Sequence, residues 1–245
     1  MEMSKAKMEN RALPKRFYRA AAVQQSGDAW TITLDGRVLK TPAKQPLLLR
    51  SKTLADSIAA EWDAQVESIQ SESMPLMRLA SIAIDRVPQD RPALIDEIVR
   101  YAGTDLLCYP APTSEELGKR QRAAYEPVLA WARQTLGMDF VSTESIMPVA
   151  QPEETLQRMR ALVSQANDAQ LAALAMITPL LGSALLAVAL WQGRIDVEQT
   201  LSAARVDENY HAEQWGADEE AVAAWAAKEK DIRAAAFFLT CNPLD

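Results

Sequence analysis

The stretch LAALAMITPLLGSALLAVALW, residues 171–191, decides between two kinds of fold. It lies within a run from Ala169 to Gly193 that has no charged residue. Its length suits a membrane-spanning helix, which takes about 20 apolar residues. The run is also rich in alanine and interrupted by Pro179, Gly182 and Ser183, and no second apolar run accompanies it. We therefore expect the buried central helix of a soluble bundle and no stable membrane insertion, with a membrane span as the alternative.

The composition outside this run is that of an ordinary globular protein. Hydrophobic residues make up 49% of the 245, so a substantial core can be buried. The net charge is −7 and there is no block of Lys and Arg, which argues against nucleic acid as a partner. Two cysteines, Cys108 and Cys241, are too few for a disulfide framework, and the chain begins without an apolar signal segment. These features predict a cytoplasmic protein.

The N-terminal part predicts a small sheet followed by a helix. In WTITL, residues 30–34, apolar residues alternate with threonine, which is the period of a half-buried strand. The dipeptide Asp35-Gly36 favours a two-residue hairpin turn, because both of its positions need positive φ. Ser51 is a plausible N-cap for a helix whose apolar stripe contains Trp62.

The remainder of the chain reads as helical. Local signals predict helix starts at Asp90, Ser114, Asp168, Asp196 and Asp218, and a short strand at residues 138–142. The fold class is therefore α+β. We expect a small N-terminal α/β-sheet domain, residues 1–75, whose first 15 residues are disordered. A larger all-helical domain resembling an orthogonal bundle, residues 76–245, follows it.

Catalytic and metal-binding signatures are absent from the sequence. It contains no phosphate-binding glycine loop, no H-E-x-x-H and no G-x-S-x-G. Glu208-x-x-His211 has the spacing of a di-iron carboxylate site, but such sites need the motif twice and His211 is the only histidine. A Cys108–His211 nucleophilic pair is disfavoured, because Cys108 lies in an apolar segment that predicts a buried, inert thiol. We expect no metal and no cofactor.

A helix over residues 206–215 would carry two sets of residues on opposite sides. The first set is Glu208, His211 and Trp215, with Asp207 at its edge, and the second is Val206, Tyr210 and Glu213. If Trp215 is exposed, a large ring flanked by acids is typical of a protein-binding surface. Two alternatives stay open: a Trp215 that belongs to the core, and a small-molecule enzyme with Asp207 and Glu208 as its general acid and base.

Seven motifs along the chain resemble one known family. In order they are RFY, LDGRVLKTP, EWDAQ, MPLMRLA, YAGTDLLCY, STESIMP and DENYHAEQWG, which together span residues 16–216. This set resembles the Atp-twelve family, the assembly chaperones of the F-type ATP synthase. The chain departs from the usual pattern at Tyr125-Glu126-Pro127, where relatives have W-D-P, and at Met77, where threonine is usual.

The resemblance implies a binding protein and not an enzyme. Members of the family bind the unassembled alpha subunit of the catalytic head, shield its aggregation-prone surface and yield to the beta subunit. The resemblance further implies a chaperone without a cofactor, and we expect a monomer. The absence of a transit peptide suggests the bacterial cytoplasm, with the mitochondrial matrix as the alternative location.

The resemblance also assigns roles to particular residues. The residues that match the acidic and tryptophan-glycine motif are expected to contact the partner: Asp207, Glu208, Glu213, Trp215 and Gly216. A structural role is expected for Trp62, Asp63 and Asp105. Trp62 would hold its helix to the sheet, and Thr104-Asp105 would cap a helix or join the two domains.

Overall fold

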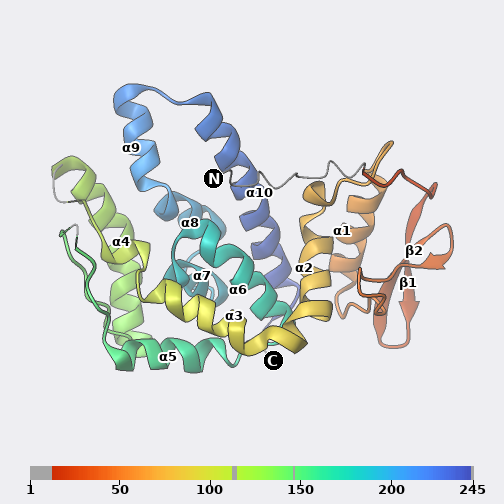
Figure 1. The fold of residues 1–245 in the computed structure, drawn as a ribbon, viewed down its shortest axis with the longest axis horizontal. Helices are drawn as coiled ribbons and strands as arrows, with labels where there is room; N and C mark the ends of the chain where they lie inside the picture. Colours follow the sequence, from red (N-terminus) through yellow and green to blue (C-terminus); the bar gives the residue numbers. More distant parts are fainter. Residues whose placement is uncertain (1–12, 112–114, 146, 244–245) are drawn as a thin grey trace, which may run out of the picture.

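The structure is a computed structural model that describes residues 13–111, 115–145 and 147–243. A small antiparallel sheet lies at one end of the molecule, and helices form the rest (Figure 1). This arrangement confirms the predicted α+β class. The expected disordered lead-in lies outside the described residues as far as residue 12. The predicted division into two domains at residue 75 stays a prediction.

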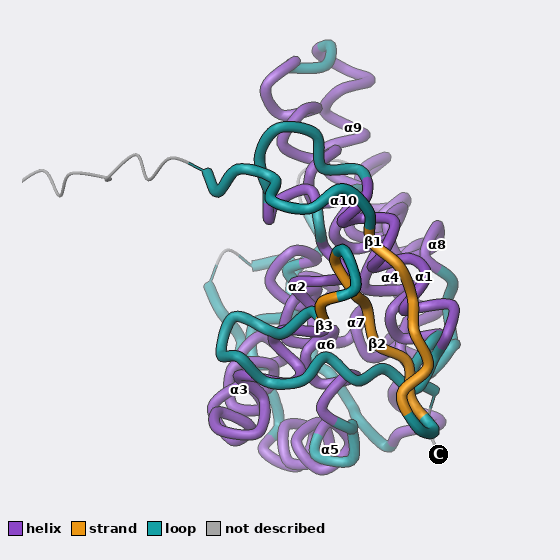
Figure 2. Tube along the Cα trace, turned by 90° about the vertical axis from the view of Figure 1, so that its right-hand side faces the viewer, coloured by secondary structure: helices purple, strands orange, loops and turns teal. Residues whose placement is uncertain are grey.

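The sheet contains the predicted hairpin. Its strands are β1 (Ala21–Ser26), β2 (Ala29–Leu34) and β3 (Arg37–Val38), in the order β1-β2-β3 with antiparallel pairing (Figure 2). Asp35 and Gly36 join β2 to β3 with φ values of 48° and 80°, which is the left-handed conformation that this turn requires. The sequence signal for the turn is therefore confirmed.

Strand β2 is buried on both faces, whereas the sequence predicted a half-buried strand. Thr31 and Thr33 are only 3% and 5% exposed. The helix at Lys52–Asp63 packs against this part of the sheet. Strand β2 is also the central strand. It pairs with β1 on one side, and on the other it pairs with β3 and then with Leu49, which exchanges backbone hydrogen bonds of 2.7 and 2.8 Å with Trp30.

Helix α1 (Lys52–Asp63) packs against β1 and β2. Ser51 caps it as predicted, since its hydroxyl accepts a hydrogen bond from the Leu54 N–H at 3.2 Å. Trp62 is buried at the end of its apolar stripe. Val66 continues the stripe in the sequence, but it is 82% exposed because the helix has already ended.

The remaining described elements are helical. They are η1 (Ser71–Ser73), α2 (Pro75–Ser81), η2 (Ile82–Arg86), α3 (Val87–Ala102), η3 (Leu106–Cys108), α4 (Glu115–Leu136), α5 (Glu153–Val163), α6 (Asp168–Leu181), α7 (Ala184–Trp191), α8 (Val197–Ala204), α9 (Val206–Trp215) and α10 (Glu219–Thr240). Residues 138–142 form no strand, contrary to expectation. The predicted caps Asp196 and Asp218 are confirmed, whereas Asn167 and not Asp168 caps α6. Ser114 lies outside the described residues.

Asp90 is not an N-cap, because the helix does not begin there. Helices α2 and α3 are joined through η2, a π-helical segment, and the chain changes direction at this point (Figure 1). Pro88 is the second residue after η2 and has no N–H to donate to the preceding turn. A proline and a π-helical turn together account for the bend, and Asp90 lies in the first turn after it.

The apolar run that opened the sequence is two helices and not one. Helix α6 ends at Gly182, which has φ of 65°, and Ser183 begins α7 by accepting a hydrogen bond from the Leu186 N–H at 2.9 Å. Both helices are largely buried, and α6 packs against α3 and α10. In the described part of the chain, no helix combines the length and the apolar character that crossing a membrane requires.

A candidate protein-binding surface on helix α9

Helix α9 is a surface element, because none of its residues is buried. It follows α8 directly at Val206 and contacts α4. With the start of α10 it projects from the body of the molecule (Figure 1). Gly216 ends the helix with φ of 87° and ψ of 156°, a conformation that glycine adopts far more easily than other residues. The role of Gly216 here is to turn the chain towards α10.

One side of α9 is fixed to α4 by polar contacts. Gln121 donates a hydrogen bond to the Asp207 carboxylate at 2.6 Å, and Arg120 pairs with Glu213 at 2.6 Å. The Arg120 guanidinium also lies 5.4 Å from the centre of the Tyr210 ring. Asp207 and Glu213, both expected as partner contacts, are therefore occupied within the molecule.

The other side of α9 is open. Trp215 is 76% exposed, so it does not belong to the core, and its ring centre lies 5.1 Å from that of His211. Glu208 is exposed, and no cation of the described residues lies within 4.0 Å of it. Of the five candidate residues, Glu208 and Trp215 are thus exposed and free of ion pairs within the described residues, Asp207 and Glu213 contact α4, and Gly216 ends the helix. That they contact a partner stays a prediction.

The E-W-D motif of α1 joins three parts of the N-terminal region. The Glu61 carboxylate accepts hydrogen bonds from the Leu76 and Met77 N–H groups, both at 2.8 Å, and so caps the start of α2. Trp62 packs edge-on against Tyr18, with ring centres 5.5 Å apart. Asp63 accepts a hydrogen bond from the Ala21 N–H at 2.9 Å, where β1 begins.

Asp105 stabilises the junction between α6 and α7 through hydrogen bonds. It is fully buried, and its carboxylate accepts hydrogen bonds from the Ser183 hydroxyl at 2.7 Å, the Leu185 N–H at 2.9 Å and the Leu107 N–H at 3.2 Å. Burial raises the pKa of Asp105 to about 6, although these hydrogen bonds act in the opposite direction. Burial also raises the pKa of the Cys108 thiol to about 12, so this cysteine is protonated and inert at neutral pH.

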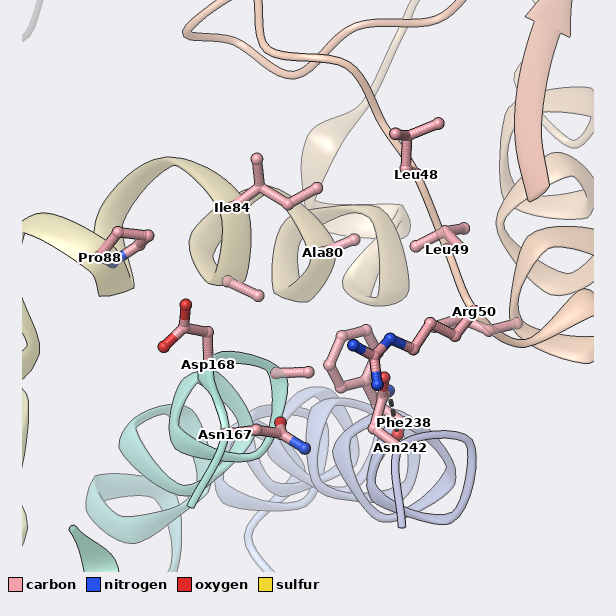
Figure 3. Close-up of a pocket in the computed structure, with 13 residues that line it drawn as sticks. Leu48, Leu49, Arg50, Ala80, Ile84, Pro88, Asn167, Asp168, Phe238 and Asn242 are labelled. Atoms are coloured by element: carbon pink, nitrogen blue, oxygen red, sulfur yellow. Dashed lines mark hydrogen bonds between the residues drawn. The ribbon is translucent and has the colours of Figure 1, made fainter. Parts of the chain in front are cut away.

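The hollow shown in Figure 3 does not have the features of an acid–base site. It has a volume of about 390 Å³ and lies between residues 48–50, α2, the start of α6 and the end of α10. Its one carboxylate, Asp168, is paired with Arg91 at 2.9 Å. Asp207 and Glu208, the acids proposed for catalysis, do not line it. Within the described residues there is also no cluster of three potential metal ligands.

The fold and the surface together define a class of protein. A large aromatic side chain exposed on a projecting helix, beside acidic groups, is typical of a protein-binding protein. Comparison with known proteins agrees with this class. Residues 15–133 match the family model described as "ATP12 chaperone protein".

Solved structures cover almost the whole chain. The crystal structure of Atp12 from Paracoccus denitrificans is 36% identical, covers 93% of this chain and 98% of its own, and superposes with a TM-score of 0.84. A candidate chaperone from Agrobacterium tumefaciens is 41% identical, with coverage of 94% and 87% and a TM-score of 0.87. The mitochondrial protein atp12 of Schizosaccharomyces pombe is 26% identical over 219 residues, which are 84% of this chain and 75% of that protein. The chain belongs to the ATP12 chaperone family, as its motifs predicted.

Proposed function

We propose that this chaperone binds the unassembled alpha subunit of the F-type ATP synthase and yields it to the beta subunit during assembly of the catalytic head. Membership of the ATP12 family supports a role in ATP synthase assembly. The observation that carries the proposed site is Trp215, 76% exposed at the open side of α9. We further propose that the protein acts as a monomer in the bacterial cytoplasm, without catalysis and without a cofactor.

The surface has the properties that a temporary partner needs. An isolated subunit exposes apolar surface that the complete assembly would cover, and such surface aggregates. A chaperone must cover it and later release it, so a small apolar contact with a polar rim is better suited than a wide apolar interface. Trp215 supplies the apolar contact, and Glu208 supplies charge at its edge.

The proposal is tested with purified proteins. We expect the chain to co-elute with isolated alpha subunit in gel filtration and to suppress its aggregation, measured by light scattering on warming. Adding beta subunit should then displace the chaperone from the complex. Absence of both a complex and any suppression would refute the proposed client.

Reversing the charge at Glu208 should weaken the complex while the fold is retained. Glu208 is exposed and has no cation within 4.0 Å among the described residues, so Glu208→Lys breaks no ion pair there. We expect an unchanged circular dichroism spectrum and an affinity for alpha subunit lower by about tenfold. Glu67→Lys, which makes the same charge change at an exposed site before η1, serves as the control. Equal loss in the two variants would mean that net charge matters and the α9 site does not.

A further inference from the structure

The basic residues of this acidic protein are concentrated in its sheet region. Residues 13–52 contain eight Lys and Arg residues and two Asp, a net charge of +6, although the whole chain carries −7. Many arginines of the helical part are paired with carboxylates, for example Arg78 with Asp231 and Arg158 with Glu154. In the described sheet region, by contrast, Arg37, Lys40 and Lys44 have no carboxylate within 4.0 Å.

Apolar side chains are exposed in the same place. Phe17 is 72% exposed and Val38 is 52% exposed, and both line a hollow of about 560 Å³ at β3. Arg37 and Lys40 line the same hollow. An exposed aromatic ring, an exposed aliphatic side chain and two cations without carboxylate partners therefore meet at one site.

The acidic groups nearby are already occupied by other contacts. The Asp35 carboxylate, which also lines the hollow, accepts hydrogen bonds from the Arg19 and Ala20 N–H groups at 3.0 to 3.1 Å. These hydrogen bonds lower the pKa of Asp35, and they orient its carboxylate towards the backbone N–H groups. Asp85 is held in the same way by the Thr41 hydroxyl at 2.6 Å and the Ala43 N–H at 3.0 Å. Neither Asp35 nor Asp85 forms an ion pair with Arg37 or Lys40 within 4.0 Å.

We propose that this hollow is a second docking site, which takes an extended acidic protein segment with an apolar side chain. Charge complementarity favours carboxylates for Arg37 and Lys40, and the apolar side chain would pack on Phe17 and Val38. Strand β3 ends the sheet, and no further strand of the described chain pairs with it, so an extended segment can lie alongside. A membrane surface is a poorer match, because a flat bilayer does not fill a hollow as an extended segment with a protruding side chain does. The site does not depend on the α9 surface.

The test uses a fluorescein-labelled peptide in which glutamates flank a single leucine on both sides. In a second peptide, serine replaces the leucine. We expect fluorescence anisotropy to show salt-sensitive binding of the leucine peptide to the full chain. The double variant Arg37→Glu/Lys40→Glu should bind it about tenfold more weakly. Phe17→Ser should weaken the leucine peptide and leave the serine peptide unchanged. Arg194→Glu, an exposed arginine between α7 and α8 with no carboxylate within 4.0 Å, is the control and should bind like the parent chain.

Four results would overturn the proposal. The first is equal binding by Arg37→Glu/Lys40→Glu and Arg194→Glu. The second is stronger binding to phosphatidylglycerol vesicles than to the peptide, and the third is a dimer in sedimentation that the double variant abolishes. The fourth is no binding of the leucine peptide at low salt. Glu208→Lys should bind the peptide normally, so a failure here and a failure of the alpha-subunit complex can be told apart.

Discussion

Replacing Asp105 with alanine is expected to lower the free energy of unfolding by roughly 3 kcal/mol at pH 7, measured by urea unfolding. The variant would leave the Ser183 hydroxyl and the Leu107 and Leu185 N–H groups buried without their acceptor. These groups lie where the apolar run breaks into α6 and α7, so the loss falls in the core. Asp28→Ala, at an exposed aspartate between β1 and β2, should change stability by less than about 0.5 kcal/mol. Equal effects of the two substitutions would contradict a central role for Asp105.

The stability difference between the parent chain and Asp105→Ala should also depend on pH. Burial raises the pKa of Asp105 from 3.8 to about 6, so the folded protein takes up a proton here before the unfolded chain does. The resulting stabilisation is complete below pH 3.8 and is lost as the pH rises through about 6. The deficit of Asp105→Ala should therefore grow by about 1 kcal/mol between pH 7 and pH 5. A deficit that stays constant or shrinks on acidification would show that the buried carboxyl is not protonated in this range.

Trp215→Ala is expected to cause the largest loss of binding to isolated alpha subunit, about thirtyfold or more, because exposed tryptophans at interfaces are common hot spots. The side chain is 76% exposed and α9 contains no buried residue, so the thermal unfolding midpoint should be nearly unchanged. Affinity would be measured by titration calorimetry. Val66→Ala, at an aliphatic side chain that is 82% exposed beyond α1, is the matched control. If Trp215→Ala and Val66→Ala bind alpha subunit equally well, the open side of α9 is not the contact.

The parts of the fold that were predicted correctly depend on local chemistry. The dipeptide Asp35-Gly36 predicts the hairpin turn between β2 and β3, because this turn needs positive φ at both of its central positions and few residue pairs adopt that conformation. Ser51, Asp196 and Asp218 predict helix starts because a short polar side chain satisfies free N–H groups of the first turn. Such signals act within a few residues, so the sequence alone reveals them.

The incorrect and missing predictions concern long-range contacts. The apolar run has one composition throughout, but Asp105, far away in the sequence, accepts hydrogen bonds at its break and so helps α7 to begin there. Glu61 caps α2 from another helix, which no local pattern indicates. Asp90 has the spacing of an N-cap, yet the helix continues through η2 before it.

The same limit applies to the candidate site. Helical spacing correctly placed Glu208 and Trp215 on one side of α9 and Glu213 on the other. It could not show that α4 covers the side with Glu213, since Arg120 and Gln121 are distant in the sequence. The contacts of Asp207 and Glu213 with α4 were therefore not foreseen, and their contact with a partner stays a prediction.

Hydrogen–deuterium exchange of the chain, free and mixed with isolated alpha subunit, tests most directly whether α9 binds the client. The free protein should exchange rapidly in α9 and in residues 216–218, since no residue of this helix is buried. In the complex we predict slower exchange over these residues and unchanged exchange in α6 and α7, which are already buried. A stable complex in which α9 exchanges as fast as in the free protein would contradict this account.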